Sequence, residues 1–381
     1  MGAMIHWCGT GLSSGPGLRR LIDQGRAVTV WTIDEPAAYA LIGGRPARIA
    51  AYSPQALRAA LNPGDVVVSM LPPDLHLSLA EIALDAEAHF VCSSYLSDAL
   101  RALDGRARDL GVALVGEVGL DPGIDHLMAH DLVADYRTSG LASPDTTLSF
   151  HSYCGGVPAQ PNAFRYKFSW SPLGVLRALK SPSRSIRHFS ELRVSRPWEA
   201  VSRFDTTLPR PESFEVYPNR DSLPFIADYR FDPGWKIEDF VRGTIRLMGW
   251  AEAWKPVFAA LEDDAPGAGD RLATLADRLW HENAYGPGEP DRVVLHVTLQ
   301  AKRAGRTVWH KSWALDATGD ARGSAMARLV SGPVSLATEA VLARTIPAGV
   351  HPAPHDAKLV ADWLAALDTQ AQYLAKHNHL T

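Results

Sequence analysis

The chain has 381 residues, of which 46% are hydrophobic and 21% are charged, and its formal net charge is −4. This length favours two domains, and the acidic balance gives no reason to expect a nucleic acid or an anionic membrane as a partner. Apolar runs are too short to supply the roughly 20 residues of a membrane-spanning helix, and we expect no signal peptide. Cys8, Cys92 and Cys154 lack paired spacing, which favours a reducing, cytoplasmic setting.

Residues 1–135 alternate short apolar runs with helical patterns, which predicts βαβ units and a parallel sheet. The predicted strands are Ile5–Cys8, Val28–Trp31, Ala47–Ala51, Val66–Met70, His89–Cys92 and Val112–Val115. The predicted helices are Leu18–Gln24, Leu75–Asp85, Ser97–Leu110 and Ile124–Tyr136. The expected fold class is therefore α/β, with an N-terminal Rossmann doubly wound parallel sheet.

After Thr138 the regular alternation stops, which indicates a domain boundary within residues 125–145. Strands are predicted at Thr146–Tyr153, Val293–Ala301 and Thr307–Leu315, the last two forming an antiparallel hairpin with a longer loop. Helices are predicted at Ile237–Met248 and Ser324–Arg344. The chain thus divides into a first domain of residues 1–135, a second of residues 136–350, and a C-terminal helical tail of residues 351–381 that can pack back on the first domain.

A glycine-rich segment, Gly9-Thr10-Gly11, lies between the first predicted strand and helix. In a dinucleotide-binding fold the first glycine permits a tight turn, and the second lets the backbone approach a pyrophosphate at the helix N-terminus. Ser14 occupies the third position of this fingerprint, so the motif is a variant, and a plain structural turn would use the same glycines. The other candidates for cofactor binding in the loops after the first and fourth strands are Leu12, Leu71 and Pro72.

Asp34 follows the second predicted strand, where a carboxylate accepts hydrogen bonds from the adenine ribose hydroxyls. A carboxylate at this position repels a 2′-phosphate, so Asp34 favours NAD(H) over NADP(H). The alternative is that Asp34 caps the helix that follows it.

The segment Glu117–His126 joins the last predicted strand of the first domain to a helix, and it holds two glycines, a proline and several ionisable groups. Ligands bind outside the carboxyl ends of the strands in open α/β sheets, so we expect a site here, at the seam between two domains. Asp121 can cap the helix that begins near Gly123, contact a substrate, or do both. His126 and His130 are one helical turn apart, but without a third ligand we expect packed histidines and no metal.

Six motifs follow one another along residues 92–246. They are Cys92–Ser97, Glu117–His126, Ser152–Ala159, Tyr166–Ser171, Tyr217–Ser222 and Arg242–Arg246. This series resembles the glutamate-forming saccharopine dehydrogenases, also called saccharopine reductases. The resemblance implies a Rossmann domain joined to an α+β substrate domain with a mixed sheet, in a homodimer. It implies an NADP(H)-dependent hydride transfer that interconverts saccharopine with L-glutamate and L-2-aminoadipate 6-semialdehyde, in lysine metabolism.

The resemblance also implies roles for individual residues. The positions that resemble substrate contacts are Ser94, Tyr95, Asp121, Arg220 and Thr244. The positions that resemble the lining of the cofactor and the cleft are Leu120–Leu127, with Leu120, Gly123 and Ile124 as the cofactor candidates among them, and Trp170. Two departures matter: NADP-specific members carry an arginine where this chain has Thr32-Ile33-Asp34, and the region between Leu261 and Pro290 is shorter than in the fungal enzymes.

Saccharopine carries three carboxylates, so a site for it needs several cations, and arginine suits bidentate capture. The candidate cations are Lys167, Arg220, Arg242 and Arg246. Arg242 and Arg246 are four residues apart on the predicted helix, which places both on one face, although a solvated surface would show the same spacing. For Arg220 the alternative is pairing with the neighbouring Asp221.

The candidates for proton transfer are Tyr95, Asp121 and Cys154. None is an obvious general acid, and positioning of the hydride donor and acceptor can outweigh a single proton shuttle. Two other functions stay open: a dehydrogenase acting on another carboxylated secondary amine, such as a polyamine or opine precursor, and a non-catalytic nucleotide-binding regulator. The substrate-side motifs argue against a regulator, which would need only the glycine-rich loop.

Overall fold

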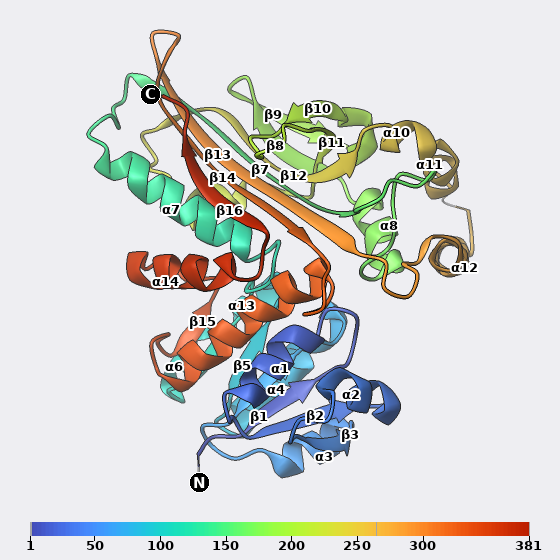
Figure 1. Ribbon diagram of the computed structural model, residues 1–381. Helices are drawn as coiled ribbons and strands as arrows, with labels where there is room; N and C mark the ends of the chain where they lie inside the picture. The colour runs from blue at the N-terminus through green and yellow to red at the C-terminus, as the bar shows by residue number, and fades with distance from the viewer. Residues whose placement is uncertain (1, 264, 381) are drawn as a thin grey trace. The chain divides into compact units, whose positions relative to one another are not determined.

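The computed structural model describes residues 2–263 and 265–380, which fold into two compact units (Figure 1). The first unit comprises Met1–Leu127, Ala321–Gly323 and Ala327–Gln370, and the second comprises Met128–Asp320, Ser324–Met326 and Ala371–Thr381. The predicted boundaries therefore need correction, because residues 128–135 belong to the second unit and residues 327–350 to the first. No helix in the described part of the chain is long and apolar enough to cross a membrane.

The first unit contains a parallel sheet with the strand order β15-β6-β5-β4-β1-β2-β3. Its strands are β1 (Ile5–Cys8), β2 (Val28–Thr32), β3 (Arg48–Ala51), β4 (Val66–Ser69), β5 (His89–Cys92), β6 (Ala113–Val115) and β15 (Gly349–His351). The series from β3 to β6 is the Rossmann order, in which the winding reverses between β1 and β4. The predicted doubly wound parallel sheet is confirmed, and β15 adds an edge strand at the junction of the predicted second domain and the predicted tail.

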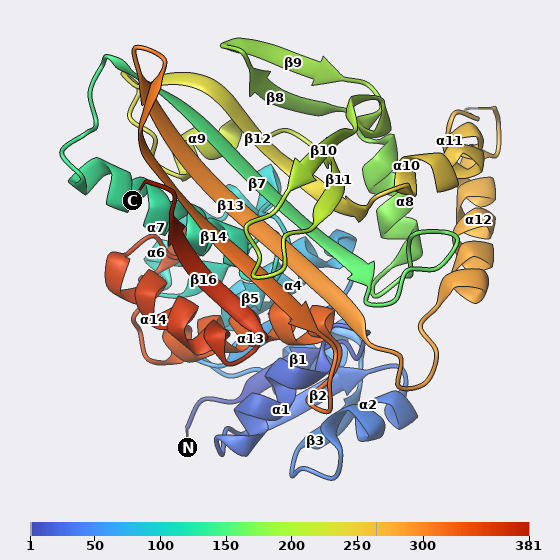
Figure 2. The ribbon, with the colours of Figure 1, turned by 45° about the horizontal axis from the view of Figure 1, so that its top comes forward.

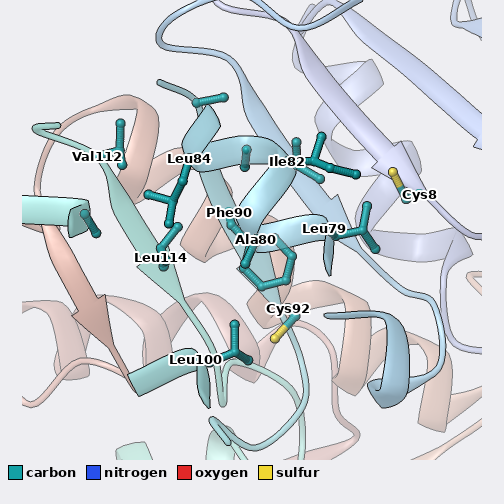
Figure 3. Close-up of a cluster of buried hydrophobic side chains, with 14 of the residues drawn as sticks. Cys8, Leu79, Ala80, Ile82, Leu84, Phe90, Cys92, Leu100, Val112 and Leu114 are labelled. Carbon is teal, nitrogen blue, oxygen red and sulfur yellow. The ribbon is translucent and has the colours of Figure 1, made fainter. Parts of the chain in front are cut away.

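Helices flank this sheet. They are α1 (Gly15–Asp23), α2 (Glu35–Ile42), α3 (Pro54–Ala60), α4 (His76–Asp85), α5 (Asp98–Arg101), α6 (Asp104–Asp109), most of α13 (Ala325–Leu342) and α14 (Ala357–Asp368). Figure 3 shows Leu79 and Leu84 of α4 near Phe90 of β5 and Leu114 of β6, all almost fully buried. Each such side chain stabilises the fold by roughly 1.5–3 kcal/mol, so this cluster fixes α4 on the sheet. The predicted helix Ser97–Leu110 is two helices, α5 and α6.

The second unit contains a mixed sheet with the order β10-β11-β12-β7-β13-β14-β16, and the hairpin of β8 and β9 pairs with β12. Its strands are β7 (Thr146–Pro158), β8 (Ser183–Arg187), β9 (Ser190–Val194), β10 (Ser202–Asp205), β11 (Ser213–Pro218), β12 (Lys236–Leu247), β13 (Asp291–Arg303), β14 (Arg306–Thr318) and β16 (Tyr373–Asn378). Figure 2 shows β7 between β12 and β13; it pairs parallel with β12 and antiparallel with β13. The predicted mixed sheet is confirmed.

The helices of the second unit include α7, which begins at the last residues of the first. They are α7 (Ile124–Thr138), α8 (Pro172–Lys180), α9 (Pro224–Asp228), α10 (Trp250–Ala253), α11 (Lys255–Leu261) and α12 (Ala268–Asn283). Asp131 of α7 accepts a hydrogen bond from Trp313 Nε1 at 2.7 Å and pairs with Lys376 Nζ at 2.7 Å. These bonds to β14 and β16 explain why residues after Leu127 belong to the second unit.

Three predicted elements are wrong. The predicted helix Ile237–Met248 is strand β12 up to Leu247, because pairing with β7 and β11 on its two sides outweighs the helical spacing of its apolar residues. The tail is helical only at α14, and its last part forms β16 against β14. The hairpin loop is shorter than predicted: Arg303 pairs with Arg306, which leaves Ala304 and Gly305 in a tight turn with φ of 48° and 76°.

Candidate active site

The loops after β1 and β4 lie at the point where the Rossmann winding reverses. A side chain at Gly9 (φ 107°) would come within 3.0 Å of the Met70 carbonyl group, so the turn itself requires this glycine. A side chain at Gly11 would meet no atom within 4 Å, so packing within the chain does not account for the second glycine. The bare backbone at Gly11 leaves the room that a pyrophosphate needs. Of the other predicted residues here, Leu12 and Pro72 are exposed and Leu71 is half-buried.

Helix α1 packs closely on α13 through a glycine that the sequence analysis did not identify. A side chain at Gly17 would lie 1.9 Å from the Ser331 carbonyl oxygen, and the Gly17 N–H donates to Ser331 Oγ at 2.8 Å. The third glycine of the nucleotide fingerprint allows close packing of the helix on a strand. Here Gly17 instead allows close packing of α1 on another helix, while Ser14 is a buried residue at the N-cap of α1.

Asp34 caps helix α2, because its Oδ1 accepts a hydrogen bond from the Ala37 N–H at 3.0 Å. The capping alternative is therefore confirmed. The residue is exposed, and Glu35 follows it in the first turn of the helix. Capping by one carboxylate oxygen is compatible with a second role towards a ribose, so the structure leaves Asp34 as a cofactor-binding candidate.

The loop between β6 and α7 is built around a buried Glu117, whose backbone is left-handed with φ of 57°. Its carboxylate accepts a hydrogen bond from the Leu96 N–H at 3.0 Å and pairs with Arg101 Nη2 at 3.2 Å and His126 Nε2 at 3.3 Å. Burial alone would raise the pKa of Glu117, but these partners outweigh it and the pKa is lowered. Glu117 thus ties this loop to the loop after β5.

His126 lies between two carboxylates, because its Nδ1 is also 3.5 Å from Asp125 Oδ2. Glu117, Asp125 and His126 are all at most 2% exposed. Asp125 Oδ1 in turn accepts the Gly123 N–H at 2.7 Å, at the start of α7. The sequence predicted only a packed histidine here. The available signal for this network was the pair of acidic residues, Glu117 and Asp125, that precede His126 in a loop with several glycines.

Tyr95 and Asp121, two predicted site residues, meet within the first unit. The Tyr95 hydroxyl donates a hydrogen bond to Asp121 Oδ1 at 3.1 Å, and both residues are half-buried. Of the neighbouring predicted positions, Leu120 and Ile124 are buried in the core, at 5% and 0% exposure. A side chain at Gly123 would lie 2.1 Å from the Gly119 carbonyl oxygen, so the loop requires this glycine.

One face of β12 in the second unit carries the predicted residues Arg242, Thr244 and Arg246, since side chains alternate along a strand. Thr244 is paired in register with Cys154 of β7, a cysteine outside any disulfide that is 6% exposed. The two strands come so close that a side chain at Gly155 would lie 2.2 Å from the Ile245 carbonyl oxygen. The structure therefore brings these four predicted residues together on neighbouring strands.

Arg246 is a buried cation surrounded by aromatic rings. Its guanidinium carbon lies 4.8 Å from the ring centre of Tyr166 and 5.5 Å from those of Tyr217 and Trp250, and the residue is 5% exposed. Nη1 donates to the Ile245 carbonyl oxygen at 3.0 Å. Among the residues that the structure describes, Nε has no acceptor and no carboxylate lies at ion-pair distance from Arg246. A buried charge without a counter-ion is expected to bind an anion.

The remaining candidates in the second unit differ in their partners and in their exposure to solvent. Lys167 Nζ lies 2.6 Å from Glu289 Oε2, so a carboxylate of the chain already neutralises it. Arg220 is exposed with φ of 55°, and the adjacent Asp221 pairs with Arg184 at 2.8 Å. Trp170 is half-buried and packs on α8.

Within residues 2–263 and 265–380, no group of three or more His, Cys, Asp or Glu residues could hold a metal ion.

Two family models match the chain: the saccharopine dehydrogenase NADP binding domain over residues 5–115 and the saccharopine dehydrogenase C-terminal domain over residues 119–371. Saccharopine dehydrogenase [NADP(+), L-glutamate-forming] of Pyricularia oryzae is 33% identical over 251 residues, which cover 64% of this chain and 54% of that protein. The enzyme of the same name from Saccharomyces cerevisiae is 36% identical over 222 residues, covering 55% and 47%. The chain thus spans about half the length of these curated relatives.

A solved structure of apo saccharopine dehydrogenase (L-Glu forming) from Saccharomyces cerevisiae matches with a TM-score of 0.83 and 28% identity. The match covers 99% of this chain and 100% of that chain. Both domain models, the relatives and the solved structure agree, and the two models together account for the Rossmann unit and the mixed-sheet unit. The chain therefore belongs to the saccharopine dehydrogenase family.

Proposed function

We propose that the chain is an oxidoreductase of lysine metabolism that interconverts saccharopine with L-glutamate and L-2-aminoadipate 6-semialdehyde. Hydride transfer at a carbon–nitrogen bond, with a nicotinamide cofactor, is the proposed reaction. Family membership supports it, and the observation that carries it is the buried Arg246 on the same strand face as Arg242. Two buried guanidinium groups suit a substrate with several carboxylates.

The proposed substrate-binding residues are Ser94, Tyr95, Asp121, Lys167, Arg220, Arg242, Thr244 and Arg246. Glu289 already neutralises Lys167, so we propose that the arginines, and not Lys167, are the main partners of the substrate carboxylates. Thr244 is half-buried between Arg242 and Arg246 on the strand, where its hydroxyl can add a hydrogen bond.

The proposed proton-handling residues are Tyr95, Asp121 and Cys154. The Tyr95 hydroxyl hydrogen bond to Asp121 Oδ1 fixes the phenol and the carboxylate relative to each other, so the pair can hold one proton between them. A bound nicotinamide would supply or accept the hydride. The main task of these side chains is then to position the substrate, since hydride transfer depends on the approach of donor and acceptor.

The glycine-rich loop fits a dinucleotide, because Gly11 leaves open space at the N-terminal side of α1. The residues that we propose for the cofactor are Gly9, Gly11, Leu12, Ser14, Asp34, Leu71, Pro72, Leu120, Gly123, Ile124 and Trp170. The matching domain model and the names of the relatives support NADP(H). Asp34 follows β2, where an acidic residue contacts the adenine ribose in NAD-binding Rossmann folds, and we propose that it shifts the preference towards NAD(H). We further propose a cytoplasmic homodimer.

Steady-state kinetics of saccharopine oxidation with NAD⁺ and with NADP⁺ tests the function, with glutamate identified by mass spectrometry. We expect turnover with one or both cofactors and stoichiometric glutamate. Turnover of another carboxylated secondary amine but not of saccharopine would contradict the proposed substrate. Cofactor binding without turnover of any such amine would identify a nucleotide-binding regulator instead.

A further inference from the structure

A buried histidine links the carboxyl ends of two neighbouring strands in the first unit. His76 Nδ1 lies 2.9 Å from Oγ of Ser69, the last residue of β4, and His76 Nε2 lies 2.9 Å from Oγ of Ser94, which follows β5. His76 is 2% exposed, Ser69 is 0% exposed, and Ser94 is half-buried. The three side chains form a hydrogen-bonded chain that runs from the core towards a proposed substrate-binding residue.

The imidazole of His76 is neutral at physiological pH. Burial lowers the pKa of His76 to about 4, and the charge of Asp74 only partly opposes this shift. His76 is also the first residue of α4, where the helix dipole disfavours a positive charge, and its ring lies edge-on to Phe90 at 6.2 Å. A neutral imidazole has one donor and one acceptor nitrogen, so the two hydrogen bonds must run in the same direction along the chain.

The fully buried hydroxyl group of Ser69 determines the direction of the two hydrogen bonds of His76. Within the described residues, the hydrogen-bond partner of Ser69 Oγ is His76 Nδ1, so a Ser69 hydroxyl that did not donate to His76 would stay unpaired in the core. A buried donor without an acceptor is strongly unfavourable. Ser69 therefore donates to Nδ1, Nε2 carries the proton and donates to Ser94 Oγ, and the Ser94 hydroxyl hydrogen points away from His76.

We propose that His76 is a positioning residue that holds Ser94 as a hydrogen-bond donor towards an oxygen of the substrate, most simply a carboxylate. This inference rests on the proposed function, because the substrate contact of Ser94 comes from the family resemblance. The opposite direction of the chain would present Ser94 as an acceptor, which suits an ammonium group. The tautomer of His76 thus selects which part of an amino-acid substrate Ser94 can bind.

Nitrogen-15 NMR of histidine-labelled protein tests the tautomer independently of activity. We expect His76, assigned by its loss in His76→Gln, to show a protonated Nε2 and no titration between pH 5 and 8. Ser69→Ala should leave the proton on Nε2 but shift the Nδ1 resonance, because Nδ1 loses its hydrogen-bond donor. Ser78→Ala should shift neither resonance, since Ser78 is exposed on the same helix and donates to the Leu75 carbonyl oxygen. A protonated Nδ1, or a titrating His76, in the unmodified chain would overturn the proposal.

Kinetics then tests whether His76 acts through Ser94. We expect His76→Phe and Ser94→Ala each to raise the KM for saccharopine roughly tenfold, with a smaller change in kcat and an unchanged KM for the cofactor. The double variant should be no worse than either single variant. His76→Gln, which keeps an N–H donor, should stay closer to the unmodified chain.

Additive effects, or a loss confined to cofactor binding, would contradict a role of His76 through Ser94. A chain that turns over no saccharopine would overturn the proposed function alone. The tautomer spectrum would still decide in that case whether His76 donates to Ser94, so the two failures remain distinguishable.

Discussion

We propose that Arg246 favours ligand binding over stability. Its guanidinium is buried, and in the described part of the chain it has no carboxylate at ion-pair distance. Removing a charge from water is costly, and contacts with aromatic rings return only about 0.5–2 kcal/mol each. The cation is therefore expected to reduce the stability of the bare protein and to strengthen the binding of an anionic substrate.

Replacing Arg246 by methionine should separate these two effects. We expect the KM for saccharopine to rise roughly 10–100-fold, because a hydrogen-bonded charge contact contributes about 1.5–3 kcal/mol. The free energy of unfolding, measured in urea, should stay the same or increase, because an apolar side chain suits the aromatic surroundings. A large loss of stability with an unchanged KM would show that Arg246 is a structural residue.

Asp34 has a confirmed role as a helix cap, so its proposed role in cofactor choice needs a variant that keeps the cap. Asp34→Ser retains an N-capping oxygen and removes the charge. We expect it to raise kcat/KM with NADP⁺ relative to NAD⁺ at nearly unchanged stability, and Asp34→Arg to raise this ratio further. If neither variant changes the ratio of the two kcat/KM values, Asp34 is only a cap.

The sequence predicted that Arg242 and Arg246 share a face, and they do, although the element is a strand. A spacing of four residues returns to the same side in both a helix and a strand, so the prediction did not depend on the element. The pairing of Lys167 with Glu289 was not predictable in this way. The two residues are far apart in the sequence, and only the folded chain brings them together.

At the scale of elements, local signals predicted the first unit better than the second. Strands β1, β2, β4, β5 and β6 are largely buried apolar runs with turn residues between them, a pattern that the sequence shows clearly. Strand β12 has Val241 and Ile245 on one face and arginines on the other, at a spacing that a helix also satisfies. Its pairing with β7 and β11, which are distant in sequence, decides the outcome.

The ion pairs and the hydrogen bond of Glu117 make the stability of the loop between β6 and α7 depend on pH. The folded pKa of Glu117 is lowered from its ordinary value of 4.5, so its contribution to stability is present above pH 4.5 and is lost as the pH falls through the folded pKa. Glu117→Gln should cost about 1–3 kcal/mol at pH 7 and flatten the acid side of the stability profile. Urea unfolding between pH 3 and 7 measures both effects, and a profile as steep as that of the unmodified chain would exclude this role.

At the scale of the whole molecule, the chain crosses between its two units more often than the sequence suggested. After β14 it returns to the first unit through α13, β15 and α14, and then adds β16 to the second sheet. No local pattern predicts such a course, because it depends on which sheet edge is free to accept a strand. The last strand is instead fixed by its partners on β14 and α7.

Lys376 of β16 is the side chain that best tests this attachment. Its Nζ lies 2.7 Å from Asp131 and 2.5 Å from Asp135, both on α7, and it is only 25% exposed. Burial would lower the pKa of Lys376, but the two carboxylates outweigh it and the pKa is raised, so this contribution to stability persists up to alkaline pH.

Lys376→Ala should therefore lower the free energy of unfolding by about 1–2 kcal/mol at pH 7, and by less at low pH, where the aspartates are protonated. Lys358→Ala provides the matched control, since Lys358 pairs with Asp362 at 2.5 Å but is 82% exposed, and it should change stability by less than about 0.5 kcal/mol. Nucleotide affinity, a property of the first unit, should be unchanged in both variants. Equal effects of the two substitutions on urea unfolding would mean that β16 is held by its backbone pairing with β14 and not by its charges.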